Sequence, residues 1–203
     1  MNKKQKYTFI SLMLASTVAA YAQYQMNVFS IDLITAYQIS ASRFAFLFTA
    51  PMLPAIFLSI PLGKLSDKIG YRNAIQLGLV FTILGLAGRI FAESYSTLWI
   101  CMAFSGASSI TLFVNSARVL EEVVPAEKSV LFMGIYTTAS MLAQTFATAT
   151  SAVLYSTLQK AYVGSLVYAV VITVIWAGNY CIEKKMLKIQ NSEMQIDLTE
   201  AKR

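Results

Sequence analysis

The sequence of 203 residues is 57% hydrophobic and 13% charged, and its formal net charge is +6. A soluble domain carries about 25% charged residues, so this composition excludes an ordinary water-soluble domain and indicates a membrane protein. The chain contains no histidine, which excludes histidine-based metal sites and histidine-based acid–base catalysis.

Six apolar blocks lie between charged clusters, and each has the roughly 20 residues that a membrane-spanning helix requires. In chain order we expect helices over residues 7–29, 42–62, 74–92, 98–119, 130–155 and 162–182. Residues 1–6 precede them, and a polar tail, residues 183–203, follows and is too highly charged to span. The predicted fold class is an all-α membrane protein with six transmembrane helices.

The basic residues are distributed unevenly over the two ends of these helices. With six spans, one side carries Lys3, Lys4, Lys6, Lys64, Lys68, Arg72, Arg118, Lys128 and the five basic residues of the tail. The other side carries only Arg43, Arg89 and Lys160. Because lysine and arginine are enriched in cytoplasmic loops, we predict two cytoplasmic termini in a multi-pass protein of the plasma or inner membrane. The same distribution explains the positive charge without a nucleic-acid partner.

The amino-terminal block also allows a second interpretation. Lysines are followed by an apolar run and by Ala20-Tyr21-Ala22, which matches the pattern of a secretory signal with its cleavage site. Cleavage after Ala22 would leave five helices. The apolar stretch continues beyond this site, which favours a span.

Between the second and third predicted helices, residues 63–73 read GKLSDKIGYRN. Glycines at 63 and 70 let a helix end and a tight turn form, and Asp67 can accept hydrogen bonds from a basic side chain or a helix amino terminus. The segment resembles the signature loop of the major facilitator superfamily, which Gly63, Asp67, Lys68, Gly70 and Arg72 match and Tyr71 does not.

This resemblance implies an amino-terminal six-helix half built as a 3+3 inverted repeat, in which the signature loop acts as a gating latch on the inner face. Arg118, followed by Gly134, gives a weaker likeness to the family's connection between helices four and five, and we assign Arg118 to the same predicted gate. We expect Arg118 or Arg72 to pair with Glu121 or Glu122. The helices lack an arginine shortly before Gly106 and lack glycine and proline in residues 140–145, which argues against a typical drug–proton antiporter.

Polar residues within spans are costly, so each is a candidate for a substrate cavity. Thr137, Ser140 and Gln144 share one face of the fifth predicted helix with Thr148 and Ser151. Asn115 in the fourth helix and Tyr21 and Gln25 in the first are further candidates. Close helix–helix contacts explain the same spacing equally well.

Other intramembrane residues have structural interpretations. Arg89 is expected near the outer end of the third helix, where it can extend to the interface and pair with Glu93. The small residues Gly78, Thr82, Gly85 and Gly88 predict close helix packing. Pro51 and Pro54 predict a kink in the second helix. The two cysteines, Cys101 and Cys181, are expected near opposite membrane faces, too far apart for a disulfide.

No nucleophile–base pair, phosphate loop or metal-ligand spacing is present, so the sequence predicts neither an enzyme nor a cofactor. The predicted function is transport of a small solute by a half transporter embedded in the lipid bilayer. It would pair with itself as a homodimer or with a separately encoded second half. An inactive truncated product and a non-transporting interaction or regulatory subunit are the alternatives. The sequence does not identify the substrate.

Overall fold

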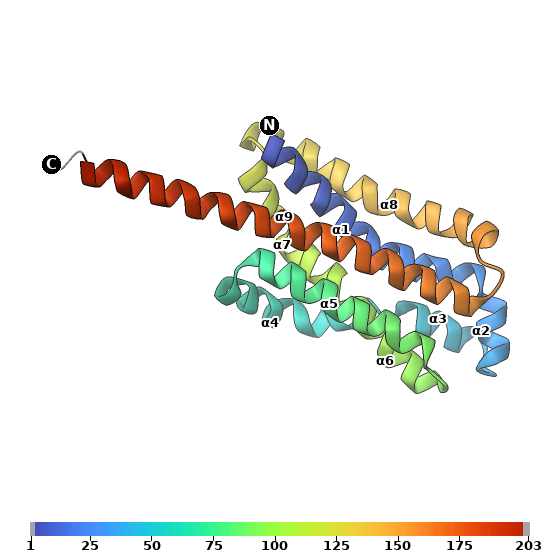
Figure 1. The fold of residues 1–203 in the computed structure, drawn as a ribbon. Coiled ribbons are helices and arrows are strands. Elements are labelled where there is room, and N and C mark those ends of the chain that lie inside the picture. Colours follow the sequence, from blue (N-terminus) through green and yellow to red (C-terminus); the bar gives the residue numbers. More distant parts are fainter. Residues whose placement is uncertain (1–2, 201–203) are drawn as a thin grey trace.

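The computed structural model describes the backbone of residues 3–200 and the side chains of residues 3–182. The first half of the chain forms α1 (Lys3–Val28), α2 (Ser30–Ala36), α3 (Ala41–Thr49), α4 (Leu53–Ile69) and α5 (Tyr71–Ile90). The second half forms α6 (Tyr95–Ser105), α7 (Ala107–Val123), the short 3-10 helix η1 (Ala126–Lys128), α8 (Ser129–Leu154) and α9 (Leu158–Glu200). The helices form an elongated bundle (Figure 1), so the all-α prediction is confirmed for the described residues.

Among the described residues, five helical stretches are long and apolar enough to cross a membrane: Ala41–Ile69, Tyr71–Ile90, Tyr95–Val123, Ala126–Leu154 and Leu158–Ile182. They correspond to the second through sixth predicted spans. The first predicted span, α1, is a helix of 26 residues that is not among them. Lysine, serine, threonine and glutamine side chains dilute the apolar residues of this helix.

Helix α1 lies at the centre of the bundle, where it packs against α7, α8 and α9. Most of its residues from Thr8 to Met26 are buried, including Ala20 and Ala22 of the possible cleavage site. Neighbouring helices therefore cover a helix that is too polar to face lipid by itself. Removal of residues 1–22 would take away a large part of the packed core.

Two of the membrane-length stretches are broken helices. The stretch Ala41–Ile69 is interrupted at residues 50–52 between α3 and α4, next to Pro51 and Pro54, so the predicted kink is confirmed. The stretch Tyr95–Val123 is interrupted at Gly106, where the sequence had predicted one continuous helix. The two breaks contact each other, because a Cβ atom at Gly106 would overlap the carbonyl oxygen of Pro51.

The small-residue face of α5 allows close packing against α6 and α7, as predicted. A Cβ atom at Gly85 would lie 2.5 Å from the backbone nitrogen of Ser105 and 2.6 Å from the carbonyl oxygen of Cys101. The hydroxyl of Thr82 accepts a hydrogen bond of 2.9 Å from the backbone N–H of Ser108, in the first turn of α7. This bond satisfies a backbone donor that the break at Gly106 leaves without an intrahelical partner.

We expect Gly85→Ala to destabilise the purified chain by about 1–3 kcal/mol, because backbone atoms of α6 must move to admit the methyl group. Gly134→Ala is the matched control, since a Cβ atom at that helical position meets nothing within 4 Å. Alanine there should be neutral or stabilising. Thermal unfolding in detergent measures both, and a Gly85→Ala variant that unfolds at the wild-type temperature would contradict the close packing.

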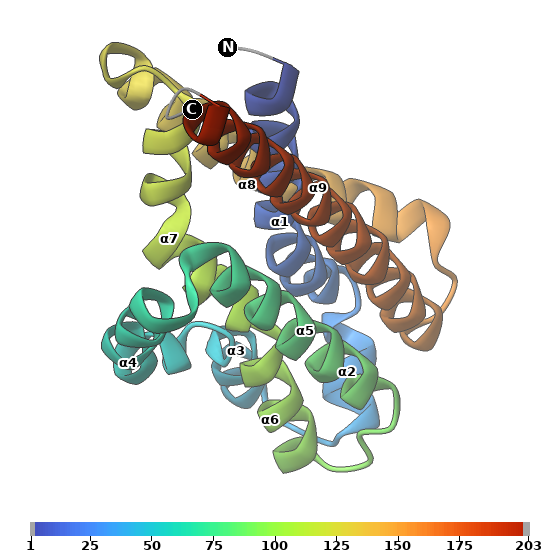
Figure 2. The same cartoon turned by 60° about the vertical axis from the view of Figure 1, so that its left-hand side comes forward.

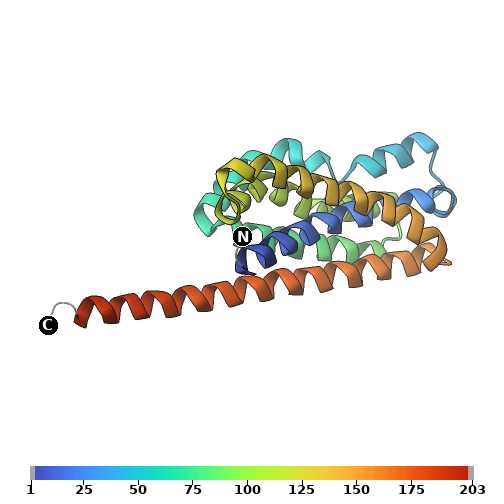
Figure 3. The same cartoon turned by 90° about the horizontal axis from the view of Figure 1, so that it is seen from above.

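The bundle has two distinct ends (Figure 1). The start of α1, the junction of α4 with α5 and the connection through η1 lie at one end, which we call the basic end. The connections between α5 and α6 and between α8 and α9 lie at the other. Figure 2 shows α4 and α8 on opposite flanks, with α1 and α5 between them. Figure 3 shows α9 along one side of the bundle and continuing beyond it, so the predicted tail starts within this helix.

Candidate functional site

An ion pair joins the ends of α4 and α7 at the basic end. The Nη1 atom of Arg118 donates to Oδ1 of Asp67 over 2.6 Å, and both side chains are exposed. Asp67 and Arg118 are both residues that the sequence assigned to a gate. The structure therefore brings the signature segment into contact with α7, the helix that carries Arg118 and the weaker likeness to the family.

A second ion pair lies one turn further along α7. The Nη2 atom of Arg72, in the first turn of α5, donates to Oε2 of Glu122 over 2.5 Å. The expected pairing of an arginine with Glu121 or Glu122 is thus confirmed for Arg72 and Glu122, whereas Arg118 pairs with Asp67. Because Arg118 and Glu122 are four residues apart on one helix, α7 holds the end of α4 and the start of α5 at the same time.

The signature segment is helical rather than a loop, which corrects the role predicted for Gly63. Helix α4 continues past Gly63 to Ile69, and a Cβ atom at Gly63 would contact Val114 of α7 at 3.9 Å. The chain turns only at Gly70, whose φ of 84° is unfavourable for residues with a side chain. Lys68 is exposed in the last turn of α4.

Beneath the ion pairs, buried polar groups link α4 to α7. The Nδ2 atom of Asn115 donates to Oγ of Ser66 over 2.9 Å and to the carbonyl oxygen of Thr111 over 2.8 Å. Asn115 and Ser66 are both buried. Asn115 therefore lies in a helix–helix contact, and Ser66 is a partner that sequence patterns did not indicate.

The two candidates on α1 occupy different surroundings. The hydroxyl of Tyr21 lies 3.4 Å from Oγ1 of Thr150, and its ring packs against that of Tyr168 at 5.0 Å. Gln25 is buried, and its Nε2 atom has no hydrogen-bond partner among the described residues.

The polar face of α8 runs from the bundle interior to its surface. Ser151 is buried, Ser140 and Gln144 are half-buried, and Thr137 and Thr148 are exposed. The exposed threonines donate to carbonyl oxygens of their own helix, at Gly134 and Gln144. These residues are thus compatible with a cavity wall or with a contact between helices.

Arg89 lies in the last turn of α5, as predicted, but its side chain does not extend to the interface or pair with Glu93. Its side chain is only 2% exposed, whereas Glu93 is exposed and forms no ion pair with it. The guanidinium donates to the carbonyl oxygen of Ala22 over 3.1 Å and to Oγ of Ser105, and its Nε atom has no partner among the described residues. The spacing of Arg89 from Gly85 and Gly78 places it on the same inward face of α5, a signal that could have predicted its burial.

The model of the Major Facilitator Superfamily matches residues 12–187. The chain belongs to this superfamily. A comparison with curated proteins gives no match. The family match begins within α1 and ends past the spanning part of α9, so it includes the central helix and both ion pairs. The chain is accordingly a multi-pass membrane protein of a transporter superfamily.

Proposed function

We propose that this superfamily member carries a small solute across the membrane by alternating access, as one six-helix half of a carrier. The family match supports transport, and the ion pairs that join α4, α5 and α7 support a gate at the basic end. The proposed gate comprises Gly63, Asp67, Lys68, Gly70, Arg72 and Arg118. An exposed ion pair such as Arg118 with Asp67 contributes about 0–1 kcal/mol, so this pair can break and form within a transport cycle.

The proposal includes α1 as a sixth span, with both termini in the cytoplasm. At about 1.5 Å per residue, a helix of 26 residues reaches about 39 Å, which exceeds the hydrocarbon thickness of about 30 Å. Its central position supports a span that neighbouring helices shield from lipid. The excess of basic residues at the end where α1 starts supports a cytoplasmic location for that end.

The helix contacts support the 3+3 inverted repeat. The first triplet of spans consists of α1, the broken helix α3–α4, and α5. The second triplet consists of the broken helix α6–α7, α8, and α9. Helix α1 packs on α8 and α9, and correspondingly α7 packs on α4 and α5. When the first triplet is exchanged for the second, the contact between α1 and α7 remains a contact between α1 and α7. The contact between α5 and α9 is likewise unchanged. The contacts between the two triplets therefore match under this exchange, which supports the repeat.

The solute site is proposed on the polar surfaces of α1 and α8. Tyr21 and Gln25 of α1 and Thr137, Ser140 and Gln144 of α8 offer hydroxyl and amide groups without a charge, which suits a small polar solute. Asn115, which is buried between α4 and α7, is assigned instead to the support of the gate. A second six-helix unit, either a second copy or a separately encoded chain, would complete the cavity.

Reporter fusions and vesicle flux test the proposal together. A reporter after Gly70 should report the cytoplasm and one after Lys160 the opposite side. The purified chain should be dimeric in mild detergent, or should co-purify with a second six-helix chain, and should admit small polar solutes into vesicles faster than empty vesicles do. A stable complex without flux would instead support a non-transporting subunit, and an unstable chain without flux an inactive product. Residues near position 70 found outside the cell would overturn the proposal.

A further inference from the structure

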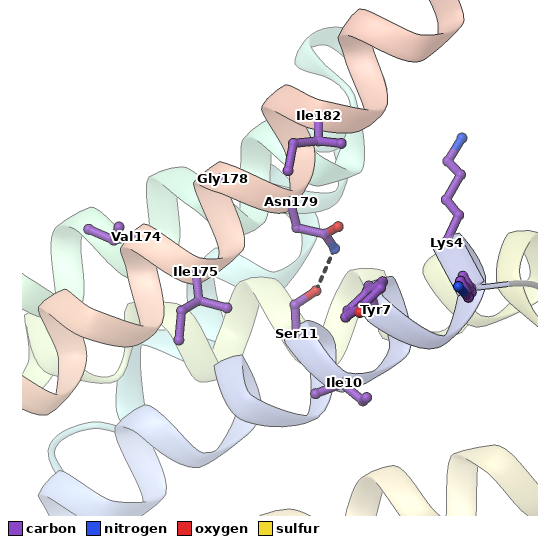
Figure 4. Close-up of a pocket in the computed structure, with 10 residues that line it drawn as sticks. Lys4, Tyr7, Ile10, Ser11, Val174, Ile175, Gly178, Asn179 and Ile182 are labelled. Atoms are coloured by element: carbon purple, nitrogen blue, oxygen red, sulfur yellow. Dashed lines mark hydrogen bonds between the residues drawn. The ribbon is translucent and has the colours of Figure 1, made fainter.

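A cavity of about 790 Å³ opens between the start of α1 and the part of α9 that ends the last spanning stretch. Figure 4 shows its two walls, with Lys4, Tyr7 and Ile10 on α1 and Val174 and Ile182 on α9. The cavity lies at the basic end, outside the ion pairs and outside the proposed solute surface on α1 and α8.

The lining divides into an apolar part and a basic part. Ile10, Val174 and Ile175 are exposed in the groove, although they belong to segments that pack in the bundle or span the membrane. Lys3 and Lys4 lie where α1 begins. An apolar groove that ends in two ammonium groups matches the chemistry of a phospholipid, whose acyl chain is apolar and whose headgroup carries an anionic phosphate.

One feature leaves space in the groove, and another fixes the two helices that form its walls. Gly178 lines it, and a Cβ atom there would meet nothing within 4 Å, so the space beside α9 is free. Next to it, the Nδ2 atom of Asn179 donates to Oγ of Ser11 over 2.9 Å and ties the two helices together (Figure 4). The side chain of Tyr7 is exposed, in a position typical of tyrosine at a membrane interface.

We propose that this groove binds an anionic phospholipid, with the phosphate at the start of α1 near Lys3 and Lys4 and an acyl chain along Ile10, Val174 and Ile175. Charge complementarity selects the occupant: a zwitterionic lipid fits the apolar part but presents no net charge to the lysines.

Native mass spectrometry of the full chain in detergent, with equal amounts of phosphatidylglycerol and phosphatidylcholine, tests the site. The wild-type chain should retain phosphatidylglycerol preferentially. Lys3→Gln with Lys4→Gln should reduce that preference about thirtyfold, the factor that two lysines near an anionic membrane surface contribute together. Gly178→Leu, whose Cβ atom meets nothing within 4 Å, places a bulky side chain in the wall of the groove and should reduce the retention of both lipids.

Lys64→Gln with Lys128→Gln is the matched control, because it removes the same charge from the same end of the bundle but from residues outside the groove. It should leave the preference unchanged. An equal loss in this control, or no loss in the Lys3 and Lys4 variant, would overturn the proposal in favour of diffuse attraction. Inorganic phosphate should not raise the unfolding temperature as phosphatidylglycerol does. If it does so equally, the site takes free phosphate and the lipid proposal fails.

Discussion

Replacing Asp67 with arginine is expected to raise the rate at which a thiol reagent labels a cysteine at position 66 by about tenfold. Ser66 is buried in α4 next to Asp67, so a cysteine there becomes accessible only when α4 and α7 separate. The variant loses the attraction between Asp67 and Arg118 and places two guanidinium groups together. A lost pair of up to about 1 kcal/mol, with repulsion of similar size, reaches the roughly 1.4 kcal/mol that corresponds to a factor of ten.

The measurement uses the full chain in vesicles, with Cys101 and Cys181 replaced by alanine and Ser66→Cys as the probe. The charge-swapped variant, Asp67→Arg with Arg118→Asp, should return labelling toward the starting rate. Glu121→Arg is the matched control, because it makes the same change of charge at an exposed position of α7. If the swapped variant is labelled as fast as Asp67→Arg alone, the ion pair does not hold the gate closed.

The membrane class could be predicted, and the residues of the proposed gate could be located, because both depend on local patterns. Long apolar blocks identify spans, and the fixed spacing of Gly63, Asp67 and Gly70 identifies the segment between two of them. The structure adds the ion-pair partners of these residues. Arg118 was predicted as a gate residue, but its pairing with Asp67 depends on how α7 crosses α4, which no local pattern specifies.

The helix boundaries were least predictable where tertiary contacts override local preference. Gly63 was expected to end a helix, yet α4 continues through it and packs against Val114 of α7. Gly106 was expected inside a continuous helix, yet the helix is interrupted there. This interruption contacts the one at Pro51. In both cases the packing of a neighbouring helix decides whether the glycine is helical.

Position 89 shows a different limit of sequence reasoning. An arginine near a helix end with a carboxylate one turn away suggests an exposed pair, and Glu93 provided that carboxylate. The inward face marked by Gly78 and Gly85 predicts the opposite, and the structure follows the face. The nearby carboxylate predicted an exposed side chain and the shared helix face predicted a buried one. The orientation of α5 in the bundle buries the side chain.

We expect Arg89→Met to stabilise the chain and to abolish at least nine-tenths of its transport. The guanidinium is buried without a carboxylate partner among the described residues, and removing one partner-less charge from a low-dielectric interior removes its desolvation penalty. Methionine fills a similar volume. It should leave no orphaned group, because the carbonyl oxygen of Ala22 lies within helix α1 and the hydroxyl of Ser105 also donates to the carbonyl oxygen of Met102.

Unfolding temperature in detergent and solute flux in vesicles, measured on the same preparation, separate the two possible roles of this arginine. If Arg89 only holds α1, α5 and α6 together, Arg89→Met must unfold at a lower temperature, because its hydrogen bonds are lost. A higher unfolding temperature with lost flux means that the charge is retained for transport at a cost in stability. Arg43→Met is the control, since Arg43 is exposed and lies over the ring of Tyr95; it should change stability by no more than about 0.5 kcal/mol. With that result, a buried charge that has no carboxylate partner among the described residues indicates an anionic group that approaches it during the transport cycle.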